Sequence, residues 1–262
     1  NITHKFKENL LYSGGISYSN YTGKFYRVMA DLLGGDWWLD VNKFADRISP
    51  DPEVAQFNLD EPNRIIKVGD VFNYNFEMHQ TKLDHFSQIE YTSSKVDGYA
   101  GINVATTSMW RNGIYKNGIY PESSQGESDK TNFVHYGIKA GMTYKINGRH
   151  YATINATYQN RPPSIRSAYL QKGYNALMAA NISNETIFGG DLNYNVRYDW
   201  LKLRATLYYY QVNDQIWTRS FYHDELATFL NYSMSNVDHL YQSGELGFEA
   251  QATETIKIKG AF

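Results

Sequence analysis

The sequence lacks several features that would assign it to a common functional class. It contains no cysteine, which excludes disulfide scaffolds, thiolate metal sites and cysteine nucleophiles. Its 25 Lys and Arg residues nearly balance its 27 Asp and Glu residues, so it has no basic surface of the kind that nucleic acid requires. No run of 18 apolar residues occurs, so we expect no transmembrane helix.

Recognisable catalytic motifs are missing as well. The sequence has no His-Glu-x-x-His and no Gly-x-Ser-x-Gly, and the glycine-rich stretch 112–130 lacks the Gly-Lys-Ser/Thr ending of a phosphate-binding loop. The adjacent residues His223, Asp224 and Glu225 could suggest acid–base chemistry, but three consecutive loop residues cannot all converge on one point. We therefore predict a protein that is not an enzyme, with no catalytic residue, no metal and no cofactor.

Aromatic residues, in contrast, are abundant, with 23 tyrosines, and many of them lie in alternating stretches. Residues 131–146 place an apolar side chain at every even position, and polar residues or glycine fill most odd positions. Only a β-strand has a period of two. Asn147-Gly148, a favoured hairpin turn, follows, and the alternation resumes with Ala152, Ile154, Ala156 and Tyr158. The pattern predicts a long antiparallel hairpin with one apolar and one polar face.

The same alternation predicts about a dozen strands. We expect them near 11–20, 24–32, 69–80, 83–94, 99–111, 131–146, 149–160, 187–199, 202–213, 243–253 and 256–262, with a less regular one at 2–7. Several have a single apolar face, such as Phe72, Tyr74, Phe76 and Met78. Short turns alternate with long loops at 33–67, 112–130, 161–186 and 214–242. The connections at 80–83 and 95–98 both look short, which an up-and-down order does not allow unless one outer hairpin is tight or 69–80 belongs to a structured loop.

Short turns at one end and long loops at the other are typical of a bacterial outer-membrane β-barrel. In that setting one face of each strand meets lipid and the other meets the lumen. The expected lipid-facing residues are Val134, Tyr136, Ile138, Ala140, Met142, Tyr144, Ile154, Tyr194, Val196, Tyr198 and Trp200. The expected lumenal residues include His135, Lys139, Thr143 and Lys145. Tyr198 and Trp200 lie beside a tight turn, where an interfacial aromatic girdle is expected.

The long loops carry the candidate ligand-binding residues, which are Trp37, Trp38, Trp217 and Tyr222. Trp37-Trp38 could stack on a sugar or another flat ligand, or could fold the loop on itself. Loop 33–67 is also rich in Asp and Glu, which suits a calcium site or a ligand-facing lid. A solvated acidic loop accounts for the same composition, because EF-hand spacing is absent.

Three segments carry a resemblance to a known family: DLLGGDWWLDVNKFADR (31–47), WRNGIYKNGIYPESSQGESDKTNF (110–133) and KAGMTYKINGRHYATINATYQNRPPS (139–164). They resemble the barrel of TonB-dependent outer-membrane receptors of the Bacteroidetes type, in the group with a carboxypeptidase-like regulatory domain. The resemblance implies a 22-stranded barrel, filled by a plug and energised by the TonB complex. No plug or TonB box occurs in these residues, so we expect residues 1–262 to be a partial barrel domain of a larger receptor whose plug and other strands lie outside this chain.

The predicted function is therefore uptake of a scarce nutrient, such as a glycan, a peptide or a metal complex, across the bacterial outer membrane. The expected partners are outer-membrane lipid, the TonB complex acting through the plug, the nutrient and a surface lipoprotein, with no nucleic acid among them. The alternative is a soluble all-β carbohydrate-binding module, whose apolar strand faces would pack together in a core. An outer-membrane enzyme is a third possibility, disfavoured because no nucleophile, base and orienting residue stand out.

Overall fold

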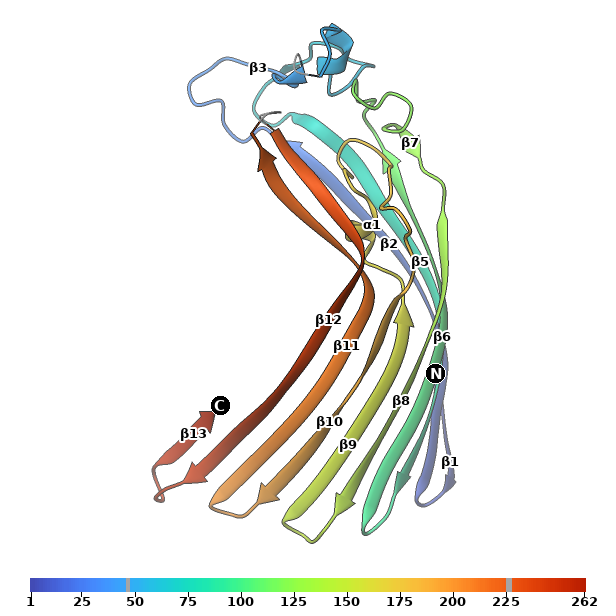
Figure 1. Cartoon of the computed structure of the whole chain (residues 1–262), viewed down its shortest axis with the longest axis vertical. Helices are drawn as coiled ribbons and strands as arrows, with labels where there is room; N and C mark the ends of the chain where they lie inside the picture. The colour runs from blue at the N-terminus through green and yellow to red at the C-terminus, as the bar shows by residue number, and fades with distance from the viewer. Residues whose placement is uncertain (46–47, 225–227) are drawn as a thin grey trace.

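The protein is an all-β molecule built on one large, curved antiparallel sheet, as a computed structural model shows (Figure 1). The structure describes residues 1–45, 48–224 and 228–262. The wall strands are β1 (Ile2–Lys7), β2 (Leu10–Val28), β5 (Val71–Thr92), β6 (Val96–Gly113), β8 (Thr131–Lys145), β9 (His150–Arg161), β10 (Glu185–Arg197), β11 (Leu201–His223), β12 (Thr228–Gln251) and β13 (Lys257–Ala261). Within the described residues, no helix has the length and apolar character needed to cross a membrane.

The wall strands follow one another in the sheet in the order of the sequence, so each pairs with its neighbours along the chain. The remaining elements are small and lie near the loop end. They are β3 (Trp38–Leu39), which pairs with β4 (Ile65–Ile66), β7 (Gly126–Glu127), which pairs with β6, a 3₁₀ helix at Pro52–Ala55, and α1 (Ile165–Ala168). The sheet is not closed: β1 and β13 are the outermost strands of the described sheet.

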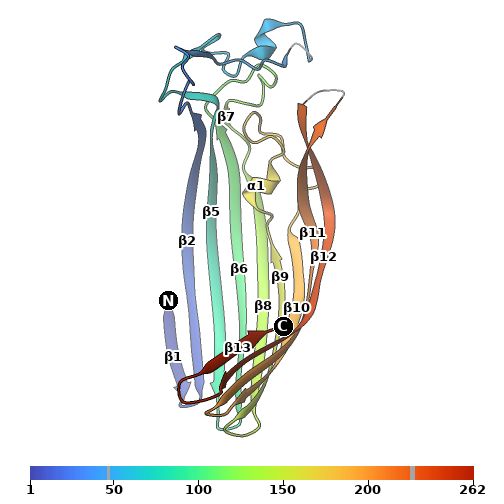
Figure 2. The same ribbon diagram turned by 90° about the vertical axis from the view of Figure 1, so that its left-hand side faces the viewer.

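The two ends of the wall differ in their connections, as Figure 2 shows. The turns between β1 and β2, β5 and β6, β8 and β9, β10 and β11, and β12 and β13 are all short and lie at one end. The loops after β2, β6 and β9 are long and lie at the other end. The predicted alternation of short turns and long loops is therefore confirmed for three of the four expected loops.

The prediction of a fourth long loop, at 214–242, is wrong. Most of it is strand, because β11 continues to His223 and β12 begins at Thr228. The pairing of these two strands shifts register between Val212 and Trp217, and Asp214 and Asn236 both have positive φ. Such β-bulges interrupt the strict alternation of side chains. The sequence consequently loses its period of two, although the strands continue.

The prediction of separate strands at 11–20 and 24–32, and at 69–80 and 83–94, is also wrong. β2 and β5 are continuous strands of 19 and 22 residues, paired from Leu10 with Tyr91 up to Val28 with Val71. This removes the conflict over the short connections, because residues 80–83 form no turn. Only the turn between β5 and β6 remains, and it lies on the short-turn side.

A change of apolar face explains why β5 resembles two strands. Phe76 and Met78, in its upper part, occupy even positions and are buried on the concave face. Leu83 and Ile89, in its lower part, occupy odd positions and are exposed on the opposite face. The apolar pattern thus moves from one side of the strand to the other near residue 81, without any break in the ladder.

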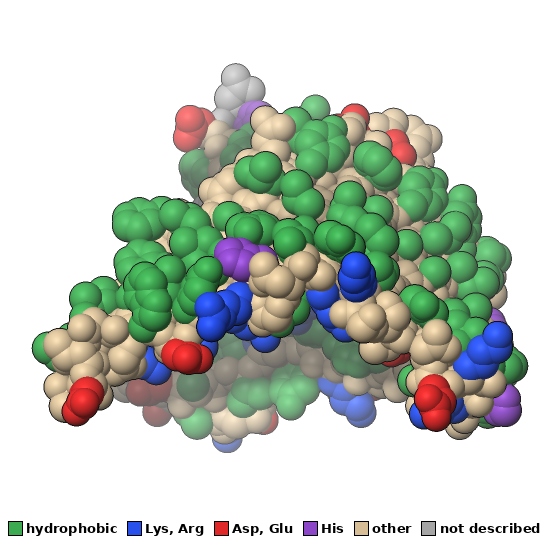
Figure 3. Space-filling view, turned by 90° about the horizontal axis from the view of Figure 1, so that it is seen from below, with side chains coloured by type: hydrophobic (Ala, Val, Ile, Leu, Met, Phe, Trp, Pro, Cys, Tyr) green, Lys and Arg blue, Asp and Glu red, His purple; other side chains and the backbone are tan. Residues whose placement is uncertain are grey.

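The convex and concave faces of the wall differ in character along most of their length. In β8, Phe133 and His135 point to the concave side and are buried, whereas Val134, Tyr136 and Ile138 are exposed on the convex side. Seen from the end with the short turns, hydrophobic side chains cover the convex surface and most charged side chains lie toward the concave side (Figure 3). The wall therefore has an apolar outside and a largely polar inside.

Candidate functional site

The lower half of the concave face carries a network of polar side chains from β9, β10 and β11, which Tyr99 of β6 joins from across β8. Asn155 of β9 is paired in register with Asp191 of β10 and donates from Nδ2 to its Oδ1 at 2.9 Å. Tyr99 of β6 donates to the Asn155 side-chain oxygen at 3.1 Å, and Arg204 of β11 donates to Asn193 at 2.7 Å. Asn193 in turn donates to Asp191. These side chains give the concave face a continuous set of donors and acceptors that an oriented polar partner can use.

A shallow hollow lies next to this network. It has a volume of about 350 Å³, and Gln88, Tyr99, Thr143 and Asn155 are among the residues that line it. Gly141 has no side chain there, and this leaves space for the side chains of Tyr99 and Asn155. Hydroxyls, amides and carboxylates dominate the lining, so the hollow favours contact with a polar surface over an apolar one.

The short-turn rim of the concave face holds ion pairs. Lys145 pairs with Asp97 at 2.6 Å and also donates to the Ser93 carbonyl at 2.9 Å. Farther along the wall, Glu249 of β12 accepts from three lysines, Lys202, Lys257 and Lys259, at 3.1 to 3.2 Å. Three cations surround one carboxylate, so this part of the rim is locally positive.

The upper half of the concave face is covered by the chain's own loop 162–184. Ile165 and Ala168 of α1, together with Tyr169, pack into an apolar cluster on the strands. The strand residues of that cluster are Phe76, Met78, Met109 and Phe133. The predicted apolar face of 69–80 therefore contacts this loop, and the loop lies on the concave side of the wall instead of extending away from it (Figure 1).

Arg111 of β6 holds this loop and its neighbour together. Its side chain is 1% exposed, and its guanidinium donates to two backbone carbonyls, those of Lys172 and Ser124, each at 2.7 Å. The hydroxyls of Tyr169 and Ser128 add a further contact at 3.1 Å. A buried guanidinium needs such acceptors, because leaving a charged donor unsatisfied in the interior is costly.

The same loop is also tied to β12. Asn231 donates to the carbonyl of Leu170 at 3.0 Å, and Ser235 donates to the carbonyl of Ala180 at 2.6 Å. Opposite β12, Asn184 donates to the carbonyl of Val134 at 2.8 Å and to Asn160 at 2.6 Å. Loop 162–184 is thus fixed to both sides of the curved wall.

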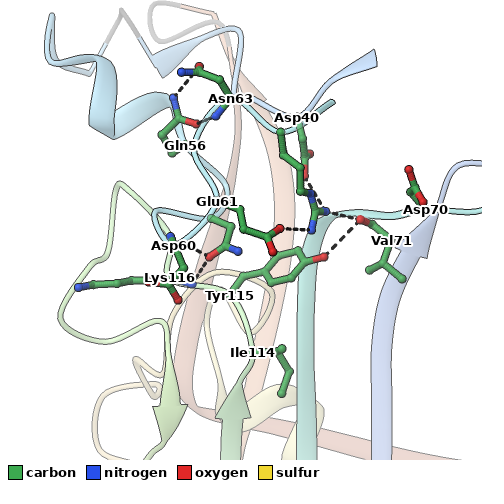
Figure 4. Close-up of polar contacts among 12 residues, drawn as sticks. Asp40, Gln56, Asp60, Glu61, Asn63, Asp70, Val71, Ile114, Tyr115 and Lys116 are labelled. Carbon is green, nitrogen blue, oxygen red and sulfur yellow. Dashed lines mark hydrogen bonds and ion pairs between the residues drawn. The ribbon is translucent and has the colours of Figure 1, made fainter. Parts of the chain in front are cut away.

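Loops 29–70 and 114–130 meet where Asp40 and Glu61 lie near Tyr115 (Figure 4). The Arg64 guanidinium pairs with Asp40 at 3.1 Å and Glu61 at 3.2 Å, donates to the Val71 carbonyl, and lies 4.9 Å from the centre of the Tyr115 ring. Burial raises the pKa of the Asp40 carboxyl, although the hydrogen bond from the Asn73 amide and the Arg64 charge act in the opposite direction. Two acids of the predicted acidic loop are consequently paired with one arginine.

Among the described residues, no group of three or more His, Asp or Glu side chains gathers as ligands for a metal ion. In loop 29–70 this follows from the pairing of Asp40 and Glu61 with Arg64. Asp51 accepts the backbone amide of Glu53, and Asp40 also accepts that of Asn73.

The four predicted ligand-binding aromatics lie on two different elements. Trp37 and Trp38 belong to loop 29–70, and the ammonium of Lys43 lies 3.9 Å from the centre of the Trp38 ring. Trp217 and Tyr222 belong to β11 and not to a loop. Trp217 packs edge-on against His239, with Arg219 over its ring at 4.3 Å. All four side chains are exposed.

The residues expected to face lipid lie on the convex side. Val134, Tyr136, Ile138, Met142, Tyr144, Ile154, Tyr194 and Trp200 are large exposed side chains, Ala140 is exposed, and Val196 and Tyr198 are partly buried. Tyr198 and Trp200 belong to the short turn after β10.

The sequence-based predictions did not include His150, whose ring nitrogens contact the hydroxyls of Tyr194 and Tyr198 at 2.8 and 3.2 Å. The alternation of residues 149–160 could have indicated His150, because this residue occupies an even position on the apolar face of that strand.

No protein-family model and no curated protein matches this sequence. Solved structures do match. They include the copper transporter OprC (12% identity, TM-score 0.66), the FrpB iron transporter from Neisseria meningitidis (10%, 0.60) and the ferric-catecholate import receptor Fiu from E. coli K12 (14%, 0.55). Each match covers 99% of this chain but only 33 to 36% of the other chain, so this chain spans about a third of their length. The polar concave face, the apolar convex face and the one-sided loops therefore belong to a fold that these transporters and this receptor share.

Proposed function

We propose that this chain is part of the barrel wall of a TonB-dependent outer-membrane transporter. The observation that carries the proposal is the apolar convex face on a wall of antiparallel strands with long loops at one end only. Only a membrane-spanning barrel needs an apolar outside together with a polar inside. The shared fold with two metal transporters and an import receptor supports the same assignment.

In the full protein, the wall continues to a closed barrel of about 22 strands and surrounds a plug, as in the Bacteroidetes-type family that the sequence resembles. The Asp191 network and the lysines around Glu249 face the lumen, where they contact the plug or a passing ligand. The TonB complex acts through that plug, and a surface lipoprotein joins the receptor at the loop end. The cargo is a scarce nutrient, of the class of a glycan, a peptide or a metal complex.

Trp37, Trp38, Trp217 and Tyr222 are the candidates for first contact with that nutrient. Their exposed rings lie on a long loop and on the upper part of β11, outside the apolar band. Exposed aromatic rings at such positions suit stacking on flat ligand groups.

A soluble carbohydrate-binding module is less consistent with the structure. A soluble sandwich buries the apolar faces of its strands against a second sheet. Here Ile138, Ile154 and Leu192 are each at least half exposed. Lipid contact by the predicted convex residues, Val134 to Tyr144, Ile154, and Tyr194 to Trp200, explains this exposure.

Fractionation of cells that express the full-length gene product tests the proposal. We expect recovery in the outer membrane, extraction only by detergent, and a single chain far larger than the 30.2 kDa of these residues. Recovery as a water-soluble protein of about that mass would contradict the proposal and favour the carbohydrate-binding module.

A further inference from the structure

The convex face changes from apolar to polar along a row of directly paired residues. Asn20 of β2 pairs with Thr81 of β5, Thr81 pairs with Ser108 of β6, and Ser108 pairs with Asn132 of β8. Below this row, Tyr18, Leu83, Val104 and Val134 are exposed apolar residues. If the wall spans a membrane, as proposed above, the row marks where the hydrocarbon ends on the loop side.

Immediately above the row lies a group that we name the Trp110 cluster, formed by Lys24, Glu77, His79, Trp110 and Lys130. It lies on the convex side, because the neighbours of Trp110 along β6, Met109 and Arg111, are buried on the concave side. His79 and Trp110 are directly paired on adjacent strands, and their rings stack with centroids 5.1 Å apart.

The Trp110 ring also carries a cation. The ammonium of Lys130 lies 4.4 Å from the ring centroid, and among the described residues no carboxylate lies within ion-pair distance of it. Lys24 pairs with Glu77 at 3.3 Å, and Glu77 also contacts His79 at 3.1 Å. The Lys24 side chain is 68% exposed, so it remains accessible to a second anion. The cluster thus holds two lysines against one carboxylate.

The depth of the cluster matches the headgroup region of a bilayer. His79 is two residues above Thr81 of the row on β5, which is roughly 5 Å along the membrane normal for a strand tilted by about 40°. The polar headgroup layer is about 5 to 8 Å thick beyond the hydrocarbon. A lipid headgroup with sugars and phosphates extends far enough to reach Lys24 and Lys130.

The chemistry of the cluster points to an anionic sugar headgroup. Lysine ammonium groups bind phosphate as point charges, and an indole ring next to them offers an apolar face to a sugar. The Nε1 of Trp110 is buried without an acceptor among the described residues. We propose that the Trp110 cluster binds the phosphorylated sugar headgroup of a glycolipid in the outer leaflet. This inference rests on the membrane placement in the proposed function.

The test uses the full-length protein purified in mild detergent. Purified phosphorylated glycolipid, built on a glucosamine disaccharide, is titrated against wild type and against K24Q/K130Q. Each lysine near an anionic headgroup contributes roughly fivefold to binding, so the double variant is expected to bind about thirtyfold more weakly. The matched control is K5Q/K7Q, which removes the same charge from β1 beside the short turns and is expected to bind as wild type does.

Three results would overturn the proposal: unchanged binding by K24Q/K130Q, equal binding of the enzymatically dephosphorylated glycolipid, or an equal loss in K5Q/K7Q. Substitution of Trp110 by Leu provides an independent check, since it keeps an apolar side chain but removes the ring, and it is expected to weaken binding. Membrane fractionation of every variant separates this inference from the proposed function. A protein found in the outer membrane without glycolipid selectivity refutes only the Trp110 site.

Discussion

At the scale of single residues, the loop end of the molecule depends on a few buried polar side chains with complete sets of partners. Asp40 is an example, because its Oδ1 accepts the amide of Asn73 at 2.9 Å and its Oδ2 accepts from Arg64 at 3.1 Å. Asn73 has a φ of 69°, so its amide has no place in the regular ladder and depends on this carboxylate. One side chain thus joins loop 29–70 to the first residues of β5.

The raised pKa of Asp40 gives a prediction with a definite sign. Its folded-state pKa lies above the ordinary value of 3.8, so the folded loop holds the proton more tightly than the unfolded loop. The contribution of Asp40 to loop stability therefore increases as pH falls from above the raised pKa toward 3.8. We expect Asp40→Asn to be tolerated at pH 7, because it keeps the acceptor for the Asn73 amide.

Asp40→Ala removes that acceptor and is expected to cost about 1 to 3 kcal/mol. Limited proteolysis of loop 29–70 at pH 7 and pH 5 compares the three proteins. Equal cleavage of the Asn and Ala variants would show that the acceptor has no role in holding the loop.

At the scale of elements, loop 162–184 is a fixed lining of the upper concave face. It buries Ile165, Ala168 and Tyr169 against the strands and hydrogen-bonds to β12 through its backbone. Long loops of outer-membrane barrels usually lie outside the wall. Here the loop packs against the concave face, and its position depends on Arg111.

We expect Arg111→Met to release this loop. The substitution keeps an apolar stem but leaves the carbonyls of Lys172 and Ser124 without their charged donor, at a cost of about 1.5 to 3 kcal/mol for each hydrogen bond. Arg111→Lys is the matched control: it keeps the charge but cannot reach both carbonyls with a planar fork, so we expect an intermediate effect. Protease cleavage within 162–184 measures the release, and cleavage equal to wild type in the Met variant would refute the role of Arg111.

The elements also show how far the sequence can predict the fold. β8 and β9 are recognisable from the sequence, since one face stays apolar from Val134 to Tyr144 and the turn at Asn147-Gly148 is distinct. β11 and β12 are not recognisable in their upper parts, because bulges between Val212 and Trp217 break the period. The inward position of loop 162–184 is not predictable either, because its apolar partners, such as Phe76 and Met109, are distant in sequence.

At the scale of the whole molecule, the two faces of the wall differ in the side chains they present. The concave face carries the Asp191 network and the ion pairs of Lys145 and Glu249, and the convex face carries exposed aliphatic and aromatic side chains. The candidate lipid-facing residues could be predicted from alternation alone. The lumenal network could not be predicted, because it depends on which polar residues are paired across four strands.

A matched pair of substitutions tests this division. Ile138 is exposed on the convex face, near the middle of the apolar band. Its replacement by lysine is expected to destabilise the assembled barrel by about 2 to 4 kcal/mol. A lysine at Thr143, on the concave face, is expected to cost less than about 1 kcal/mol, because that face is polar. Urea unfolding of the full-length protein in lipid vesicles measures both. Equal destabilisation would contradict the assignment of inside and outside.

The change of apolar face within β5 also affects how the direction of each strand is assigned from the sequence. A method that requires one apolar side per strand divides β5 near residue 81, and each such division reverses the assigned direction of every later crossing. The predicted strands 11–20 and 24–32 divide β2 as well, although its pairing with β5 is continuous there. The two divisions cancel, so loops 114–130 and 162–184 keep their correct side. Correcting only one of them would assign every later loop to the wrong end of the sheet.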